Sequence, residues 1–152
     1  MIEQQYIYNY DLICKAEQKT FELTNSFLIM QQAAKACYSF ILKNLIKQKT
    51  LVLCGSGNNG GDGTLIAQHL IQQNFSVDIH YPFGFPKTDD SKKALDLLSD
   101  KKRVKENISF DNYTLIVDAL FGTGLNRKLE PSVLSFIDRI NRSEAKIISI
   151  DM

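Results

Sequence analysis

The sequence predicts an α/β fold in which a mostly parallel β-sheet is covered by helices. Three observations support this fold class. Short, almost continuously apolar segments recur along the chain, as expected for strands buried on both faces. Segments with apolar residues at helical spacing lie between them. The loops that join the two kinds of segment are short, which favours parallel strands connected by helical crossovers.

Length, composition and charge narrow the possible classes of protein. The chain has 152 residues, 44% hydrophobic and 23% charged, which suits a single globular domain over residues 1–152. The formal net charge of +1 gives no reason to expect nucleic acid or a membrane as partner. No apolar segment is long enough to span a bilayer and no signal peptide is visible, so a cytoplasmic location is expected. Cys14, Cys37 and Cys54 are far apart and are expected to be reduced thiols.

Two helices are predicted before the first strand. Residues 10–22 are polar with apolar residues at helical spacing, and residues 26–48 have a broad apolar face. Thr24, Asn25 or Ser26 could cap the second helix. The predicted apolar face consists of Phe27, Met30, Ala34, Cys37, Phe40 and Ile41.

Strands and helices then alternate to the end of the chain. The predicted strands are residues 50–54, 75–82, 113–120 and 146–152. The segments predicted to contain the helices between them are residues 62–74, 85–102 and 131–143. Pro131 is in a favourable first-turn position. Basic and acidic residues alternate between positions 92 and 106, which indicates a solvated helix face.

Chemically suggestive residues follow three of the predicted strands. A glycine-rich loop containing Asn58, Asn59 and Asp62 follows the first strand, Asp118 is near the end of the third, and Asp151 is at the end of the fourth. In open parallel sheets, ligands bind outside the carboxyl ends of the strands. The sequence therefore predicts a site along this edge, together with the loop over residues 122–128.

The glycine-rich loop fits the pattern G-x-G-x-x-G, which alone is weak support for dinucleotide binding. No lysine follows the glycines as a P-loop requires. Asp78 is inside the second strand rather than at its end, where a ribose-binding acid is expected. Asp62 either caps the following helix or belongs to the site.

Two further groups of residues allow alternative interpretations. Asn59 and Asp118 could hold a cation through oxygen ligands, or could form a hydrogen-bonded pair that fixes the loop. In the loop over residues 122–128, Arg127 and Lys128 suit a phosphate, although either could simply face solvent.

The motifs GSGNNGGDG, VDALFGTGLNRKLEP and INRSEAKIISID resemble the NAD(P)HX epimerase family, also called the YjeF N-terminal domain. The resemblance covers essentially the whole chain and includes LIMQQAAKA, where the family usually has a Met-Glu-x-Ala-Gly pattern. It implies a Rossmann-like, three-layer α/β/α sandwich. It also implies epimerisation of the C6-hydroxylated forms of NADH and NADPH, a metabolite-repair reaction. A partner dehydratase then acts on only one epimer, and family members often form homodimers.

The resemblance also implies roles for individual residues. Asp151 is the candidate acid–base residue, and Asn59 and Asp118 match ligands of a potassium ion. The glycine-rich loop would then meet the hydrated nicotinamide and the cation rather than grip a diphosphate. The residues matched to substrate binding are Asn58, Asn59, Gly60, Gly61, Asp62, Gly122, Thr123, Gly124, Leu125, Asn126, Arg127, Lys128 and Asp151.

The match also implies that the chain is short at its C-terminus relative to the family. The family continues with a D-x-P-S-G turn, whose serine supplies another potassium ligand, and with further strands; this sequence ends in SIDM. Two explanations are open: a shortened form of an active enzyme, or a module that binds nucleotide or RNA without catalysis. A conventional NAD-dependent oxidoreductase is a third hypothesis and depends on G-x-G-x-x-G alone.

Overall fold

The computed structural model describes residues 12, 15, 16, 19, 24–45, 47–126 and 128–151. Its elements are α2 (Ser26–Asn44), β1 (Thr50–Cys54), α3 (Asn58–Gln72), β2 (Val77–His80), α4 (Asp89–Asp96), the 3-10 helices η1 (Lys101–Arg103) and η2 (Phe110–Asn112), β3 (Leu115–Ala119), α5 (Pro131–Asn141) and β4 (Lys146–Ser149). Most of the helix predicted over residues 10–22 lies outside the described residues.

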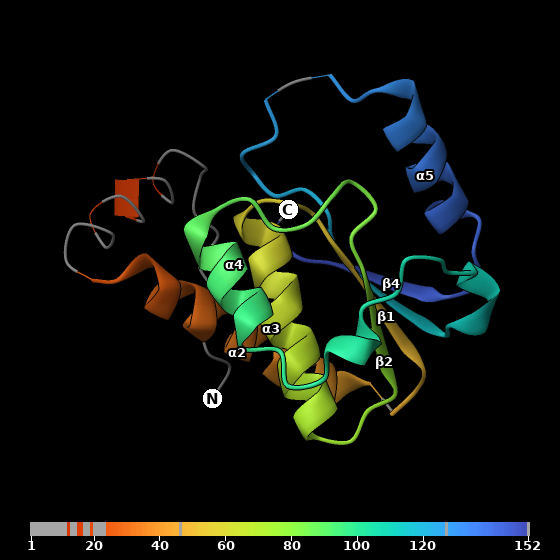
Figure 1. Ribbon diagram of the computed structural model, residues 1–152, viewed down its shortest axis with the longest axis horizontal. Helices are drawn as coiled ribbons and strands as arrows, with labels where there is room; N and C mark the ends of the chain where they lie inside the picture. The colour runs from red at the N-terminus through yellow and green to blue at the C-terminus, as the bar shows by residue number, and fades with distance from the viewer. Residues whose placement is uncertain are drawn as a thin grey trace, which may run out of the picture.

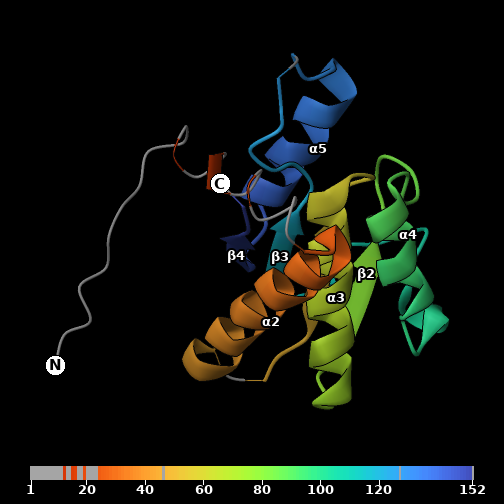
Figure 2. The same ribbon diagram turned by 90° about the vertical axis from the view of Figure 1, so that its left-hand side faces the viewer.

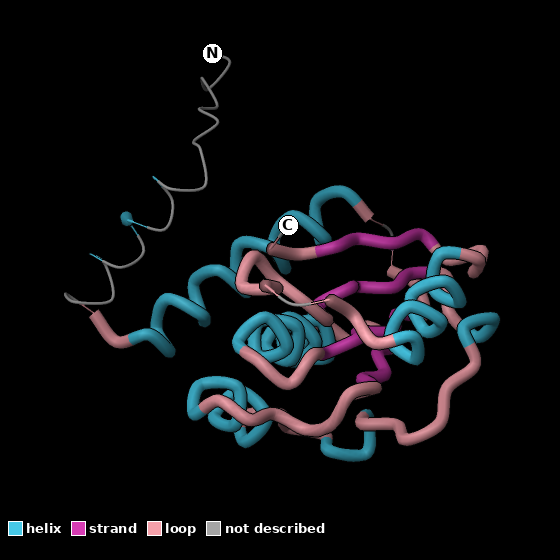
Figure 3. Tube along the Cα trace, turned by 90° about the horizontal axis from the view of Figure 1, so that it is seen from above, coloured by secondary structure: helices cyan, strands magenta, loops and turns pink. Residues whose placement is uncertain are grey.

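The four strands form one parallel sheet in the order β2-β1-β3-β4. Figure 3 shows the strands side by side. In this register Leu53 lies opposite Asp118, and Asp118 lies opposite Ser149. From β1 the chain continues to β2, which lies on one side of β1. It later reaches β3, which lies on the other side of β1. The loops therefore diverge between β1 and β3, where such sheets bind ligands.

The sheet is the middle layer of three, as the resemblance implied (Figures 1 and 2). Alternate side chains of β1 enter different cores: Val52 and Cys54 pack with α2, α3 and α4, whereas Leu51 and Leu53 pack with η2 and α5. Every residue of β1 is buried, which explains why its sequence is continuously apolar.

The connection from β2 to β3 passes from one face of the sheet to the other. After α4 the chain runs along the edge of β2, where Val104 forms a parallel bridge with Ile79 and the Lys105 amide donates to the Ile79 carbonyl at 2.8 Å. Phe110 of η2 then packs in the core on the α5 side. This route covers the outer edge of β2 and brings the chain to β3 on the second face.

Several helix boundaries agree with the sequence, and others need correction. Asn25 caps α2 by accepting a hydrogen bond from the Phe27 amide at 2.8 Å, and Pro131 begins α5. Phe40, however, is 58% exposed and is not part of the buried face of α2. Helix α3 begins at Asn58 rather than at residue 62. No helix among the described residues is both long and apolar enough to cross a membrane.

Candidate functional site

The glycine-rich loop between β1 and α3 is folded tightly against its own chain. A β-carbon at Gly60 would lie 1.8 Å from the carbonyl oxygen of Gly55, and one at Gly55 would lie 2.0 Å from that of Leu120. A β-carbon at Gly57, in contrast, would meet nothing within 4 Å. Gly55 and Gly60 are therefore required for packing within the protein, and Gly57 is the open position of the motif.

Gly61 also has a packing role. A β-carbon there would lie 2.8 Å from Sδ of Met30 on α2, and Ser91 of α4 is also close. Gly60 and Gly61 line neither of the cavities described next. Their assignment to substrate binding remains a prediction, whereas their packing role accounts for the double glycine.

Two cavities open at the carboxyl ends of the strands. The larger has a volume of about 500 Å³ and lies between the glycine-rich loop and the loop that follows β3. The smaller, of about 340 Å³, lies between α2 and the N-terminal half of α3. Four residues line both cavities, which therefore adjoin: Asn58, Asn59, Thr123 and Asp151.

Asn59 is the most unusual residue at the junction of the cavities. Only 8% of it is exposed, yet neither its Oδ1 nor its Nδ2 atom has a hydrogen-bond partner among the described residues. A buried amide without partners costs free energy. Because it lines both cavities, Asn59 is placed to bind an acceptor through Nδ2 and a cation or donor through Oδ1.

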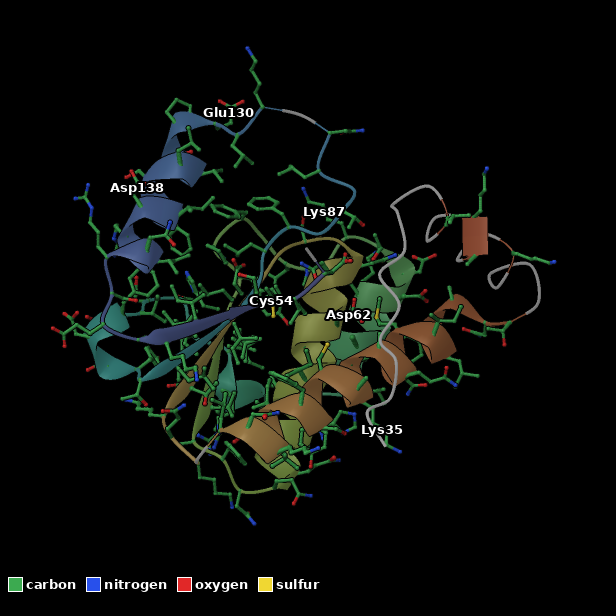
Figure 4. The ribbon with its side chains drawn as sticks, turned by 180° about the vertical axis from the view of Figure 1, so that it is seen from behind. Lys35, Cys54, Asp62, Lys87, Glu130 and Asp138 are labelled. Atoms are coloured by element: carbon green, nitrogen blue, oxygen red, sulfur yellow. The ribbon has the colours of Figure 1, made fainter. Side chains whose placement is uncertain are left out.

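Asp62 is inside α3 (Figure 4). It lines the smaller cavity. The interpretation of Asp62 as a helix cap is wrong, because Gly57 occupies the cap position and makes no side-chain cap bond. Burial, and then the charge of Asp151, raise the pKa of Asp62 to about 7. Its Oδ1 atom is buried without a hydrogen-bond partner among the described residues. A carboxyl group with these properties can hold a proton near neutral pH.

Asp151 lies across the site from α3. Its φ of 56° is in the left-handed region, which aspartate tolerates better than most residues. The Thr123 amide donates to its Oδ2 atom at 3.4 Å. The structure therefore brings the predicted acid–base residue to both cavities and to the loop after β3.

Asp118 is near this site but not in the lining of either cavity. Its Oδ1 atom accepts from the Leu120 amide at 3.0 Å, and its Oδ2 atom accepts from the Ser149 hydroxyl at 3.4 Å. These bonds hold the start of the loop after β3. They agree with the interpretation that Asp118 fixes a loop by hydrogen bonding. Its partners, however, are Leu120 and Ser149 rather than Asn59.

The loop after β3 forms one wall of the larger cavity, as predicted. Arg127 lies outside the described residues, so its predicted role is not addressed by the structure. The other predicted loop residues all line this cavity: Gly122, Thr123, Gly124, Leu125, Asn126 and Lys128.

The structure adds site residues that the sequence did not indicate. Lys87, from the loop before α4, lines the larger cavity, and Cys37 of α2 lines the smaller. Burial and the charges of Asp62 and Asp151 raise the pKa of the Cys37 thiol. No local motif marks Lys87 or Cys37, because their segments reach the site only through tertiary packing.

Asp78 has no place in this site. The Tyr113 hydroxyl donates to its carboxylate at 3.0 Å, and Tyr113 belongs to the core on the α5 side of the sheet. Asp78 thus points away from the face that carries α3. A conventional dinucleotide site needs an acid at the end of the second strand to bind the ribose. Asp78 instead bonds to Tyr113 on the other face of the sheet, which counts against the oxidoreductase hypothesis.

Comparison with known proteins places this site in a family. The family model described as YjeF-related protein N-terminus matches residues 26–152. The chain belongs to this family. The YjeF-related match includes the glycine-rich loop, Asp118 and the loop after β3, so the site lies within the region that defines the family.

Several YjeF-related relatives have names that describe an activity. The chain is 39% identical over 103 residues to an NAD(P)H-hydrate epimerase of Leuconostoc kimchii, covering 66% of this chain and 46% of that protein. It is 33% identical over 132 residues to one of Lentilactobacillus buchneri, covering 84% and 61%. It is 34% identical over 134 residues to a bifunctional NAD(P)H-hydrate repair enzyme of Dictyoglomus turgidum, covering 82% and 26%. The match therefore spans between about a quarter and three fifths of these relatives.

A solved structure supports the fold. The crystal structure of the yeast protein ynu0 superposes with a TM-score of 0.74 at 18% identity, covering 97% of this chain and 70% of that one. At this identity the likeness concerns the fold, and it agrees with the three-layer arrangement of the YjeF-related chain.

Proposed function

We propose that the protein is an NAD(P)H-hydrate epimerase, which interconverts the R and S epimers of hydrated NADH and NADPH. The names of its relatives support this reaction. The observation that carries the proposal is the meeting of Asn59, Asp62 and Asp151 at one cavity, with the loop after β3 opposite.

The two carboxyl groups suit the chemistry. Inverting C6, which bears a hydroxyl and adjoins a ring nitrogen, requires proton transfer and stabilisation of the charge that develops. In this proposal Asp62, whose pKa is raised to about 7, holds a proton near neutral pH. Asp151 acts as the acid–base residue at the same cavity. Two carboxyl groups at one cavity can share the acid and base roles of such a reaction.

A potassium ion is part of the proposal. Its support is the buried Oδ1 atom of Asn59, which lacks a partner among the described residues. Asn59 and Asp118 would hold the ion together with backbone carbonyl groups, and the ion would supply positive charge beside the reacting ring. Of these two residues Asn59 has the stronger claim, because both carboxylate oxygens of Asp118 already accept hydrogen bonds.

The proposal is tested by separating the two epimers of hydrated NADH and following their interconversion by chromatography. The purified 152-residue chain is expected to accelerate interconversion over the spontaneous rate, more in potassium than in sodium. Asp151→Asn is expected to lower the acceleration by about a hundredfold and to leave a measurable rate. A rate unchanged by Asp151→Asn would contradict the role given to this residue.

Other outcomes would lead to the remaining hypotheses. A folded chain that binds the nucleotide without accelerating interconversion would support a non-catalytic nucleotide-binding module. Hydride transfer with robust turnover would revive the oxidoreductase. In the epimerase proposal the hydrated nucleotides are the substrates, and a dehydratase that accepts one epimer consumes the product. Assembly as a homodimer remains a prediction for sedimentation analysis.

A further inference from the structure

Lys87 belongs to the loop between β2 and α4, and this loop is attached to the glycine-rich loop. The Lys87 amide donates to the Ser56 carbonyl at 2.8 Å, and the Thr88 hydroxyl donates to Oδ1 of Asn58 at 2.6 Å. Lys87 lines the larger cavity. Its ammonium group has no hydrogen bond or ion pair with the described residues, unlike Lys92 and Lys93 of α4, which pair with aspartates. The backbone is thus held while the cation is left available.

The walls around Lys87 supply further positive charge. Lys128 lines the same cavity from the loop after β3. Gly57, the N-cap residue of α3, also lies there and makes no side-chain cap bond, and the first turn of α3 has no acidic residue. The first-turn amides and the positive end of the helix dipole therefore have no side-chain acceptor at the cap.

Asn59 provides an independent indication that a ligand binds here. Its Nδ2 donor is buried without a partner among the described residues, and Asn59 lines the cavity beside the helix N-terminus. The amide, the helix terminus and the two lysines come from separate segments of the chain. All of them offer donors or positive charge to the same space.

The two cavities differ in the charged residues that line them. Glu130 and Asp151 line the larger cavity with the two lysines, whereas Asp62, Asp90 and Asp151 line the smaller, which contains no lysine or arginine among its lining residues. A strongly negative group is therefore repelled less in the larger cavity, where two lysines balance two carboxylates, than in the smaller. Glu130 and Asp151 balance the formal charge of the two lysines, so the attraction of the larger cavity for a diphosphate depends on the Lys87 ammonium, unpaired among the described residues, and the N-terminus of α3.

We propose that Lys87, with Lys128 and the first-turn amides of α3, binds the diphosphate that links the two nucleosides of the substrate. This differs from the expectation taken from the resemblance, in which the glycine-rich loop meets the nicotinamide and the cation rather than a diphosphate. This inference rests on the proposed function. It also orients the substrate: the diphosphate lies in the larger cavity and the hydrated nicotinamide points toward Asp62 in the smaller one. Each charge-assisted contact to a phosphate oxygen strengthens binding more than a neutral hydrogen bond does.

The inference is tested by titrating ADP-ribose, which contains the diphosphate, into the full chain by calorimetry. Lys87→Met, which removes the charge and keeps an extended side chain, is expected to weaken binding by about tenfold or more. Lys87→Arg is expected to stay within about threefold, because it restores a cation that binds phosphate. Lys35→Met is the control, because Lys35 is an exposed residue of α2 that lines neither cavity (Figure 4); it should bind as wild type does.

The outcomes separate this inference from the proposed function. A wild-type chain that does not bind ADP-ribose, or a Lys87→Met chain that binds it equally well, would overturn the inference. A loss confined to 2′-phosphorylated ADP-ribose would also overturn it, because Lys87 would then bind the 2′-phosphate. The epimerase assay on the same samples is independent: binding that depends on Lys87 without turnover contradicts only the proposed function. Melting temperatures are expected to match, because Lys87 is exposed.

Discussion

The backbone of Gly122 lies against the carboxylate of Asp151. A β-carbon added to Gly122 would stand 2.1 Å from Oδ2 of Asp151 and 3.4 Å from the β-carbon of Asn59. The glycine in the loop after β3 thus leaves the space in which the proposed acid–base group sits. This relationship between Gly122 and Asp151 can be tested directly.

Gly122→Ala is expected to lower kcat for epimer interconversion by about tenfold to a hundredfold, because displacing a reacting group by about 1 Å has effects of this size. Stability should change little, because the Asp151 side chain is exposed and free to shift. A double-mutant cycle identifies the cause. If Gly122→Ala acts through Asp151, the double variant with Asp151→Asn will be no slower than Asp151→Asn alone; additive losses would contradict this explanation.

Gly60→Ala is expected to destabilise the protein by about 3 kcal/mol or more, because its β-carbon would overlap a backbone carbonyl that cannot move independently. Gly57→Ala is the matched control in the same motif. Its β-carbon meets nothing within 4 Å, so the change should be within about 1 kcal/mol. Urea unfolding of both variants measures the difference. Equal destabilisation would show that the tight approach of Gly60 to Gly55 is not the reason for the motif.

Asp62→Asn is expected to stabilise the protein increasingly as pH rises. The pKa of Asp62 is raised from 3.8 to about 7, so between these values the folded chain keeps a proton that the unfolded chain releases. The favourable contribution is therefore complete below pH 3.8 and is lost as pH rises through 7. One pKa unit corresponds to about 1.4 kcal/mol, so the gain should reach a few kcal/mol at pH 8 and be small at pH 4.

The measurement for Asp62→Asn is the free energy of unfolding in urea across this pH range. Asp138→Asn is the control, because Asp138 is an exposed residue on α5, outside both cavities (Figure 4). Its stability curve should run parallel to that of wild type. If the stability curve of Asp62→Asn also runs parallel to that of wild type, folding does not raise the pKa of Asp62.

Asn59→Ala is expected to abolish stabilisation by potassium without weakening the fold. The Asn59 amide has no partner to lose among the described residues, so removing it should leave stability unchanged or raise it by about 1 kcal/mol. Wild type should melt at a higher temperature in potassium chloride than in sodium chloride, because a ligand of the folded state stabilises it. Asn59→Ala should melt at the same temperature in both salts.

Asn58→Ala provides the contrasting case for this experiment. The Asn58 side chain accepts a hydrogen bond from Thr88 at 2.6 Å, so its loss should lower stability by about 1 kcal/mol. The difference in melting temperature between potassium and sodium should remain. A potassium response of equal size in Asn59→Ala and wild type would remove Asn59 from the ligand set.

Much of the fold could be predicted from the sequence, because its signals are local. The continuously apolar segment of β1 indicated a buried strand, and the alternation of elements predicted a parallel sheet. Pro131 marked one helix start, and the start of α2 was narrowed to a cap at Thr24, Asn25 or Ser26. Helix α3 was predicted to begin too late. Glycines disfavour helix in isolation, whereas in the folded chain Gly60 and Gly61 are required by close contacts with Gly55 and Met30.

By itself the sequence determined the α/β class, the parallel sheet and the edge at which Asn59, Asp118 and Asp151 gather, since each follows from residue order and strand direction. Only the tertiary structure decided which of these residues line a cavity. The burial that raises the pKa of Asp62 and the placement of Lys87 opposite the loop after β3 depend on segments distant in sequence packing together. Burial and electrostatic environment are properties of the assembled layers, so no local pattern in the chain specifies them.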